Sequence, residues 1–353
     1  MIRVVVVDDS EAVRKLLTYI LNGDPEIQVV GTASDGEEAV RVVERLRPDV
    51  VTMDVVMPRM DGYEATRRIM RSTPVPIVVV SASYSTEEVS RTFQAMGSGA
   101  LTAVDKPMGP GDPLHEQRAR ELLAMVKLMS EVKVVGRRYP VRPTASAPAM
   151  SAWNQTPPIH AVAVGASTGG PQVLELILRT LPNAFRLPVL LVQHIAEGFA
   201  HGLADWLQGA TSLEVRVAAH DENLAPGRCY VAPSGRHMGV SRARRIVLNT
   251  APPENGLRPS IDFLFRSVAA SLGRNAAGVL LTGMGRDGAE GLKAMRDQGA
   301  LTVAQDEETA VIPGMPREAV QIGAARLVLS PDQIAAWLLE LNERAENRVN
   351  NHG

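Results

Sequence analysis

Short runs of apolar, β-branched residues alternate with longer amphipathic segments along most of the chain. In the first third, apolar runs fall at 2–7, 27–32, 49–53, 76–80 and 100–104, and helical periodicity follows at 11–22, 36–46, 62–72, 86–97 and 114–131. Strands that are apolar throughout, each followed by a helix, are typical of a parallel sheet covered on both faces. Because such crossovers are almost always right-handed, the pattern predicts a doubly wound α/β sheet.

The alternation stops after residue 133 and returns near residue 158. The interval 134–157 is rich in Pro, Ser, Ala and Thr and has no apolar periodicity, so we predict a linker there. The chain then divides into a first domain at 1–133 and a second domain at 158–347.

The second domain repeats the strand and helix pattern with one difference. Strands are expected at 160–165, 187–193, 214–218, 228–232, 245–249, 277–282 and 300–304, and helices at 170–181, 199–208, 260–272, 288–298 and 331–346. The run of strands near 228–249 without an intervening helix indicates an antiparallel hairpin. We therefore predict a second doubly wound, mostly parallel α/β domain with a hairpin attached.

Charge and composition narrow the possible partners. The 353 residues include 37 basic and 39 acidic ones, for a net charge of −2, and aromatic residues make up only 4%. This balance gives no electrostatic footprint for a nucleic acid or a membrane surface. The single cysteine, Cys229, fits a reducing compartment, and no apolar stretch reaches the ~18 residues of a membrane span. We expect a cytoplasmic protein that is not membrane-embedded and binds no nucleic acid.

Polar residues follow the predicted strands of the first domain at the point where each strand ends. Asp8 and Asp9 follow the first strand, Asp54 the third, Ser81 the fourth and Lys106 the fifth. The carboxyl ends of parallel strands meet at one edge of a sheet, so these side chains should converge. Clustered carboxylates favour Mg²⁺, and a hydroxyl and an ammonium beside them suit a phosphoryl group. Each residue alone would be an ordinary turn or helix-start residue; their coincidence at four strand ends indicates a phosphorylation site.

The segments VVVVDDS, VVTMDVVMPRMDGYEATRRI, VVVSAS and VDKP resemble response-regulator receiver domains over about residues 1–125. The resemblance implies a flavodoxin-like (βα)5 fold and Asp54 as the phospho-acceptor. It implies a Mg²⁺ site formed by Asp8, Asp9, Asp54 and the backbone carbonyl of Val56.

Two further positions match the switch residues of receivers, and one departs from them. Ser81 and Lys106 correspond to the switch hydroxyl and lysine. Ala103 stands where receivers commonly have Phe or Tyr, three residues before the lysine. We expect the phosphoryl chemistry to survive this difference, and the sequence leaves open how the signal is transmitted to the second domain.

The stretch HAVAVGASTGGPQVLELILRTL, residues 160–181, places Ser167 among small residues between a strand and a helix. A phosphate loop would read G-x-x-x-x-G-K-[ST] and a dinucleotide fingerprint G-x-G-x-x-G, and GASTGGP matches neither. An ordinary turn residue and a nucleophile both remain open, because Gly, Ser, Thr and Pro are what a tight strand-to-helix turn uses.

A nucleophilic serine needs a base and a group that orients the base, and both follow other strands of the second domain. His194 follows the strand 187–193, and Asp287 lies in GMGRDGAEG after the strand 277–282. His194 would take the Ser167 proton, Asp287 would hold the imidazole tautomer, and the Thr168 N–H would face the oxyanion. A cap serine, a rim histidine and an N-cap aspartate before the next helix are the ordinary alternatives, and spacing alone does not decide between them.

The segments VGASTGGPQVL, VQHI, YVAPSGRHMGV, PSIDFLF and LLTGMGRDGAEGL resemble the catalytic domain of the CheB family of chemotaxis protein-glutamate methylesterases, over about residues 159–347. The order of receiver and catalytic domain is similar to that family as well. The resemblance implies hydrolysis of γ-glutamyl methyl esters on methyl-accepting chemotaxis receptors with release of methanol, and deamidation of receptor glutamines.

The same resemblance implies roles for individual residues and partners. Ser167 would be the nucleophile, His194 the base and Asp287 the orienting acid, with the Met284 N–H as a second oxyanion donor. The esterase chemistry would need no cofactor, and the chemotaxis histidine kinase CheA would be the phosphodonor. An unphosphorylated receiver would cover the active-site groove, and a phosphate on Asp54 would open it.

Two other functions are the alternatives to this one. A DNA-binding response regulator would need a basic reading element, and the densest basic cluster, Arg242 to Arg245, fits a solvated hairpin edge. A receiver attached to an inactive hydrolase fold, acting as an adaptor, is the second alternative. Methanol release that depends on Ser167 would distinguish the enzyme from the adaptor.

Overall fold

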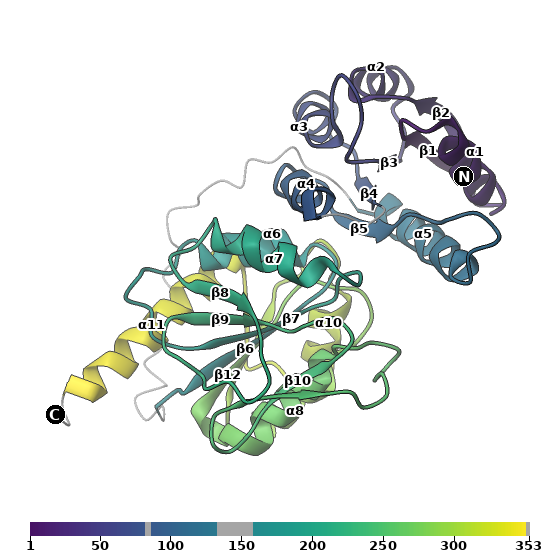
Figure 1. Cartoon of the computed structure of the whole chain (residues 1–353). Helices are drawn as coiled ribbons and strands as arrows, with labels where there is room; N and C mark the ends of the chain where they lie inside the picture. Colours follow the sequence, from purple (N-terminus) through teal and green to yellow (C-terminus); the bar gives the residue numbers. More distant parts are fainter. Residues whose placement is uncertain (82–85, 133–157, 351–353) are drawn as a thin grey trace. The chain divides into compact units, whose positions relative to one another are not determined.

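The computed structural model describes residues 1–81, 86–132 and 158–350. By its internal contacts the chain divides into two compact units, Met1–Pro140 and Val141–Gly353 (Figure 1). The linker predicted at 134–157 lies outside the described residues, so the boundaries at 133 and 158 stay predictions.

The first unit contains a five-stranded parallel sheet with the order β2-β1-β3-β4-β5. Strands β1 to β5 span Ile2–Val7, Ile27–Ala33, Val50–Met53, Ile77–Ser81 and Thr102–Asp105. Helices α1 to α5 span Glu11–Asn22, Gly36–Leu46, Gly62–Ser72, Thr86–Gly97 and His115–Ser130. This strand order is that of the flavodoxin-like fold, so the predicted fold is confirmed.

Local capping explains where two of these helices begin. The side chain of Asp35 accepts a hydrogen bond from the N–H of Glu38 at 2.9 Å and starts α2, and Asp61 accepts from Glu64 at 2.9 Å and starts α3. Each carboxylate satisfies a backbone donor that has no partner within the helix. Helices α1 and α5 contact each other on one face of the sheet, and α2, α3 and α4 pack in sequence on the other.

The second unit is built on a seven-stranded parallel sheet with the order β14-β13-β12-β6-β7-β9-β8. Its strands β6 to β9 and β12 to β14 span Ala161–Ala166, Val189–Gln193, Glu214–Val217, Arg228–Val231, Ala276–Leu280, Leu301–Gln305 and Leu327–Leu329. Helices α6 to α11 span Gly170–Leu178, Phe199–Gln208, Ile261–Leu272, Ala289–Asp297, Gly314–Gln321 and Pro331–Asn350, and a short 3-10 turn, η2, spans Gly273–Asn275. The first strand, β6, lies between β12 and β7, so the chain reverses its direction of winding there, and such switch points are where doubly wound sheets build their sites.

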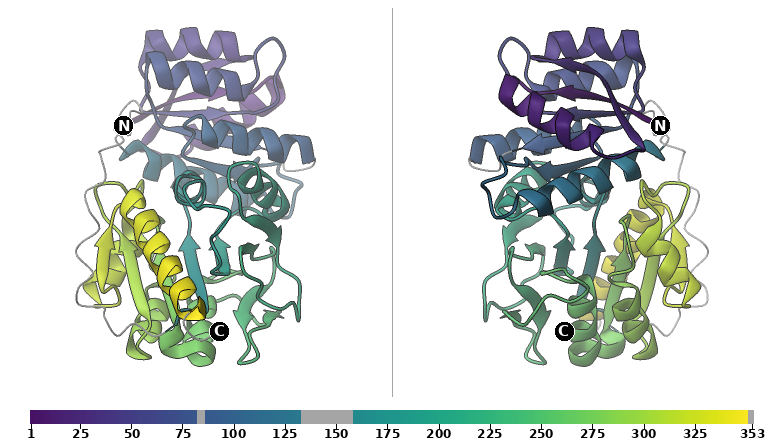
Figure 2. Two further views of the ribbon diagram at one scale, coloured as in Figure 1. Left: turned by 90° about the vertical axis from the view of Figure 1, so that its left-hand side faces the viewer. Right: turned by 90° about the vertical axis from the view of Figure 1, so that its right-hand side faces the viewer.

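Alternate side chains along the strands pack on different helices. Val164 and Leu191 share an apolar layer with residues of α6 and α11, whereas Ala163 and Leu190 belong to the layer formed with α8 and α9. Figure 2 shows α11, in yellow, running along one side of the sheet, and α11 contacts α6. Each buried Leu, Ile or Phe contributes roughly 2 kcal/mol, so apolar burial is what holds α8 against β6 and β12.

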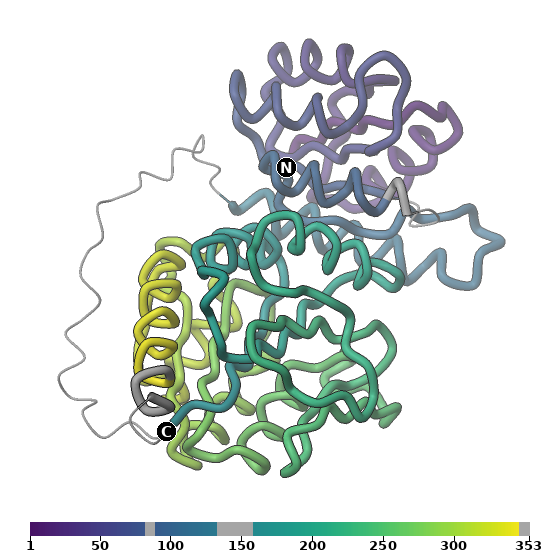
Figure 3. Tube along the Cα trace, turned by 60° about the vertical axis from the view of Figure 1, so that its left-hand side comes forward, coloured from purple at the N-terminus to yellow at the C-terminus, as the bar shows by residue number. Residues whose placement is uncertain are grey.

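An antiparallel hairpin is present, but its strands differ from the expectation. It pairs β10, His237–Val240, with β11, Ile246–Asn249, in a separate two-stranded sheet, while residues 228–231 form the parallel strand β9. Strand β10 contacts α8, and in Figure 3 this green part of the chain lies across the second unit from yellow α11. The segment HMGV was not predicted as a strand because it holds a single β-branched residue and a glycine.

Two other elements were also missed. Helix α10 begins after Pro313 and contains Pro316. Prolines disfavour a helical interpretation of a sequence, but a proline is tolerated in a first helical turn, where its missing N–H has no partner to lose. Strand β14 has only three residues, too few for a period-2 pattern. No described helix combines the length and the apolar character needed to cross a bilayer.

Cys229 lies on β9, the strand next to the edge strand β8 of the second sheet, and is fully buried. Burial raises the pKa of its thiol to about 12, because the thiolate would lose its hydration. The thiol therefore stays protonated and inaccessible in the folded protein.

We expect Cys229 to resist alkylation by iodoacetamide at pH 8 in the native protein and to react fully in denaturant, as measured by mass spectrometry. Rapid labelling of the native protein would contradict the burial of β9.

Candidate active site

Three neighbouring strands of the second sheet carry the predicted catalytic residues at their carboxyl ends. Ala166 of β6 is in register with Gln193 of β7, so Ser167 and His194 follow as the next residues on adjacent strands. The N–H of His194 donates to the carbonyl of Ala166 at 2.9 Å, which fixes the two chain segments side by side. Asp287 comes from the loop after β12, on the other side of β6.

His194 and Asp287 form a hydrogen-bonded pair. The distance from His194 Nε2 to Asp287 Oδ2 is 2.9 Å, and the two side chains are 10% and 2% exposed. With Nε2 bound to the carboxylate, Nδ1 is the ring nitrogen left to act on a substrate or nucleophile. Within the described residues neither His194 Nδ1 nor Ser167 Oγ has a hydrogen-bond partner, so the structure joins the base to the acid but shows no bond from Ser167 to His194.

Asp287 lies at the N-terminus of α8 and does not cap the helix that follows it, whose N-cap is Gly288. It accepts hydrogen bonds from the N–H of Ile261 at 2.7 Å and from the hydroxyl of Ser260 at 2.8 Å. Burial by itself would raise the pKa of Asp287. The hydrogen bond and charge of His194, with these two donors, outweigh burial and hold that pKa below its usual value. The Asp287 carboxylate is therefore ionised at neutral pH while it accepts the hydrogen bond from His194.

Ser167 sits on a strand-to-helix turn that only small residues can form. Gly169 has φ +76, in the left-handed region, and a Cβ there would lie 2.6 Å from Val311. A Cβ on Gly283 would lie 2.6 Å from the Cβ of Ser167 and 2.4 Å from Met315 Sδ. Because Gly283 has no side chain, the loop after β12 packs directly against Ser167.

The two predicted oxyanion donors both have free N–H groups. Among the hydrogen bonds of the described residues, neither the N–H of Thr168 nor that of Met284 is given to an acceptor. Thr168 is buried at the start of the turn before α6, and Met284 follows Gly283 on the opposing loop. Backbone N–H groups without an acceptor, close to the positive N-terminal end of a helix, can stabilise an oxyanion.

The first sheet carries a second cluster at the carboxyl ends of its strands. Lys106 Nζ lies 2.8 Å from Asp8 Oδ2 and 3.0 Å from Asp54 Oδ2. Carboxylate oxygens of Asp8, Asp9 and Asp54 lie within 4.8 Å of one another. Burial raises the pKa of Asp54 to about 6, against the opposing charge of Lys106 and with the charge of Asp8 adding to the rise.

The donor set fits a hard divalent cation. Three carboxylates supply oxygen ligands. Within the described residues no N–H is donated to the carbonyl of Val56, a residue that is 38% exposed. Ser81 is buried at the end of β4, and its carbonyl accepts from the N–H of Lys106 at 2.8 Å. The predicted residues of this site are thus brought to one edge of the sheet.

Comparison with known proteins identifies the family to which the chain belongs. A family model described as CheB methylesterase matches residues 162–338, and a model described as response regulator receiver domain matches residues 4–117. The chain belongs to the CheB methylesterase family. This makes it an enzyme, a protein-glutamate methylesterase and protein-glutamine glutaminase, with a receiver domain of two-component signalling.

Relatives match the chain over nearly its whole length. It is 52% identical to protein-glutamate methylesterase/protein-glutamine glutaminase 4 of Geobacter metallireducens over 97% of this chain and 99% of that protein. It is 50% identical to the corresponding protein 1 of Syntrophus aciditrophicus, over 97% and 98%. The catalytic domain structure of Thermotoga maritima CheB methylesterase matches at a TM-score of 0.50 and 35% identity, over 52% of this chain and 98% of that one.

Gln193 of this CheB family member links Ser167 and His194, and the sequence did not single it out. Gln193 is 4% exposed, and its amide Nε2 donates to the carbonyl of Ser167 and to that of His194, each at 2.8 Å. A single amide thus ties the turn that carries the serine to the segment that carries the base. Gln193 lies in VQHI, but a glutamine carries no catalytic chemistry of its own and gave no signal.

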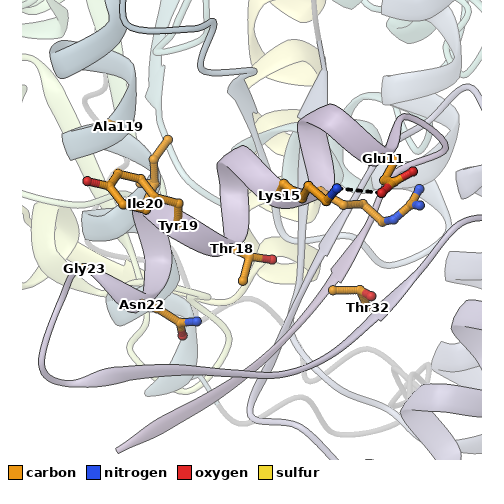
Figure 4. A pocket seen from close by; sticks show the side chains of 10 residues that line it. Glu11, Lys15, Thr18, Tyr19, Ile20, Asn22, Gly23, Thr32 and Ala119 are labelled. Carbon is orange, nitrogen blue, oxygen red and sulfur yellow. Dashed lines mark ion pairs between the residues drawn. The ribbon is translucent and has the colours of Figure 1, made fainter.

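The CheB-family receiver has a further hollow, on α1 and away from the carboxylates. It is lined mainly by α1 residues between Glu11 and Gly23, with Ala119 of α5 at its edge (Figure 4). Lys15 there is paired with Glu11 at 2.7 Å, and Tyr19 is 79% exposed. None of the Asp8, Asp9 and Asp54 side chains lines it, so it is separate from the predicted phosphorylation site.

We expect Gly283→Ala to lower kcat/KM for ester hydrolysis by at least about 10-fold, because the added Cβ must displace Ser167 or Met315 and small misplacements of reacting groups are costly. Gly209→Ala is the matched control, since its Cβ would meet nothing closer than 3.4 Å. Equal activity of the two variants, measured by methanol release, would contradict the close approach of Gly283 to the serine.

Proposed function

We propose that the chain hydrolyses glutamyl methyl esters on chemoreceptors, releasing methanol, and deamidates receptor glutamines, through Ser167, His194 and Asp287. The observation that supports this most directly is the 2.9 Å hydrogen bond between His194 and Asp287, beside Ser167 and inside the stretch that the methylesterase family matches. The alternative from another class is a DNA-binding output domain. It would have to be formed by residues 162–338, which the methylesterase family model matches.

The proton transfer follows from which ring nitrogen is bound. Asp287 accepts the Nε2–H of His194, so Nδ1 carries the lone pair and takes the proton from Ser167 Oγ. The imidazolium that forms is stabilised by the adjacent ionised carboxylate, which does not itself take the proton. Ser167 Oγ attacks the γ-carbonyl of the substrate as this proton leaves it.

The rest of the reaction depends on the backbone around the serine. The N–H groups of Thr168 and Met284 stabilise the negative oxygen of the tetrahedral intermediate. His194 returns its proton to the leaving methoxide, and methanol departs from an acyl-enzyme that water hydrolyses. For a glutamine the same step protonates the leaving nitrogen as ammonia. The chemistry uses no cofactor.

Asp54 is the proposed site of control. Asp8, Asp9 and Asp54 with the Val56 carbonyl would hold Mg²⁺, which supplies positive charge to an incoming phosphoryl group. Lys106 is already placed beside the Asp54 carboxylate, and Ser81 lies at the end of the neighbouring strand β4.

Regulation and partners complete the proposal. The chemotaxis histidine kinase CheA would supply the phosphoryl group, and phosphorylation would shift the population toward an open active site. The receiver at 1–133 and the catalytic domain at 158–347 would be joined by the linker at 134–157. Methyl-accepting chemotaxis receptors, as substrates with their modified side chains in the cytoplasm, imply a cytoplasmic enzyme.

Ser167→Ala should lower methanol release from methylated receptor membranes by at least ~1000-fold, because no other hydroxyl replaces the nucleophile. Ser212→Ala, at an exposed serine of the same domain, is the control and should match the wild type. Retained release in Ser167→Ala would exclude the proposed chemistry, and no release from any variant or the wild type would favour the adaptor.

Asp54→Ala should leave a folded enzyme whose activity a small phosphodonor no longer raises, because the acceptor carboxylate is gone. Asp49→Ala removes an exposed carboxylate at the other end of β3 and should keep the activation seen in the wild type. The methanol assay with and without phosphodonor measures both, and equal activation of Asp54→Ala and wild type would rule out this mode of control.

A further inference from the structure

We propose that Ser260 is a positioning residue for hydrolysis, whose hydroxyl fixes the Asp287 carboxylate so that Oδ2 faces His194. The inference rests on the proposed function, since it assigns a purpose to a contact of the Ser167, His194 and Asp287 group. Ser260 touches neither His194 nor the place where a substrate would react, so its effect passes through Asp287.

The direction of the Ser260 hydroxyl is determined by its surroundings. Ser260 is fully buried and forms the N-cap of α8, where its oxygen accepts the N–H of Phe263 at 3.3 Å. That contact occupies the oxygen as an acceptor and leaves the O–H to donate. Asp287 Oδ1 lies 2.8 Å away as the acceptor.

The carboxylate of Asp287 is held at both oxygens. Oδ2 accepts from His194 at 2.9 Å and from the N–H of Ile261 at 2.7 Å, and Oδ1 accepts from Ser260 and from the N–H of Asp262 at 3.2 Å. Without the hydroxyl, Oδ1 keeps only the longer of its two bonds. The carboxylate could then rotate about its χ2 angle, a soft torsion in aspartate, and lose its alignment with the imidazole.

Ser260 is itself anchored to the hairpin. Its N–H donates to Nδ1 of His237 at 3.2 Å, and His237 Nε2 donates to the carbonyl of Pro252 at 3.1 Å. The His237 ring stacks on Phe263 with centroids 4.7 Å apart. His237 is fully buried. These contacts run from β10 through Ser260 to Asp287. They assign a supporting role to the segments YVAPSGRHMGV and PSIDFLF, which contain no residue that takes part in the reaction itself.

Asp262 adds a reason why the orientation of Asp287 must be controlled. Its side chain accepts the N–H of Gly291 at 2.6 Å and is buried beside Asp287. Two carboxylates so close repel each other, so the orientation of Asp287 depends on donors of its own. The Ser260 hydroxyl donates to one of them only, and thereby keeps Asp287 turned to His194.

The competing explanation is that Ser260 is a helix cap and nothing more. Ser330 provides a matched comparison in the same domain, because its hydroxyl accepts the N–H of Gln333 at the start of α11 and donates to no catalytic group. Glycine caps a helix nearly as well as serine, so Ser260→Gly removes the hydroxyl while largely sparing the cap. Ser260→Ala removes both.

The test uses the full-length enzyme with Ser260→Ala, Ser260→Gly and Ser330→Ala, and measures kcat and KM for methanol release, Tm, and the ¹H NMR signal of the His194 Nε2 proton. We expect both Ser260 variants to lower kcat by about 10- to 100-fold with KM within about twofold of wild type, since a misplaced base slows chemistry and not binding. The His194 proton signal should shift or broaden in both. Ser330→Ala should lose only a few degrees of Tm.

Three results would overturn the proposal. The first is kcat of both Ser260 variants within about twofold of Ser330→Ala. The second is an unchanged His194 proton signal. The third is unfolding of both variants at the assay temperature, which would make Ser260 a residue of the fold alone. Ser167→Ala separates these results from failure of the proposed function, because an inactive Ser167→Ala beside fully active Ser260 variants refutes this inference only.

Discussion

The parallel pairing of β12, β6 and β7 is the constraint on which the active site depends. Parallel strands point their carboxyl ends to the same edge, and the reversal of winding at β6 leaves room there between the connections on either side. The register places Ser167 and His194 as successors of paired residues, and the loop after β12 brings Asp287 from the other side. A shift of one residue in either pairing would send these side chains to opposite faces of the sheet.

Both units are doubly wound parallel sheets with different strand orders, and a different kind of chemistry is proposed for each. In both units acidic or nucleophilic residues follow buried strands, where apolar cores hold the backbone and the loops are free to carry polar groups. The surroundings of each carboxyl group then determine its pKa, and so its protonation state. Burial dominates at Asp54 and raises its pKa to about 6. At Asp287 the hydrogen bond and charge of His194, with the donors Ile261 and Ser260, outweigh burial and keep the pKa low.

Much of the fold could be predicted from the sequence, because buried parallel strands and amphipathic helices leave strong periodic patterns. The β/α alternation, the strand-end residues and the motifs of the two family domains are all local features of the chain. Where the pattern is weak the prediction was wrong or incomplete. Strand β10 has little β-branched character, β14 is too short, and the prolines of α10 signal a loop unless the helix is known to start there.

The sequence by itself determined which residues are proposed to carry the chemistry, since Ser167, His194, Asp287 and Asp54 stand in segments that can each be interpreted separately. Only the tertiary structure decided how they are held. It showed that Asp287 binds Nε2 of His194 and lies at the start of α8, that Gln193 joins two carbonyls, and that Ser260 reaches Asp287. These contacts join residues from different strands and helices, and their hydrogen bonds depend on distances that only packing of the whole domain sets.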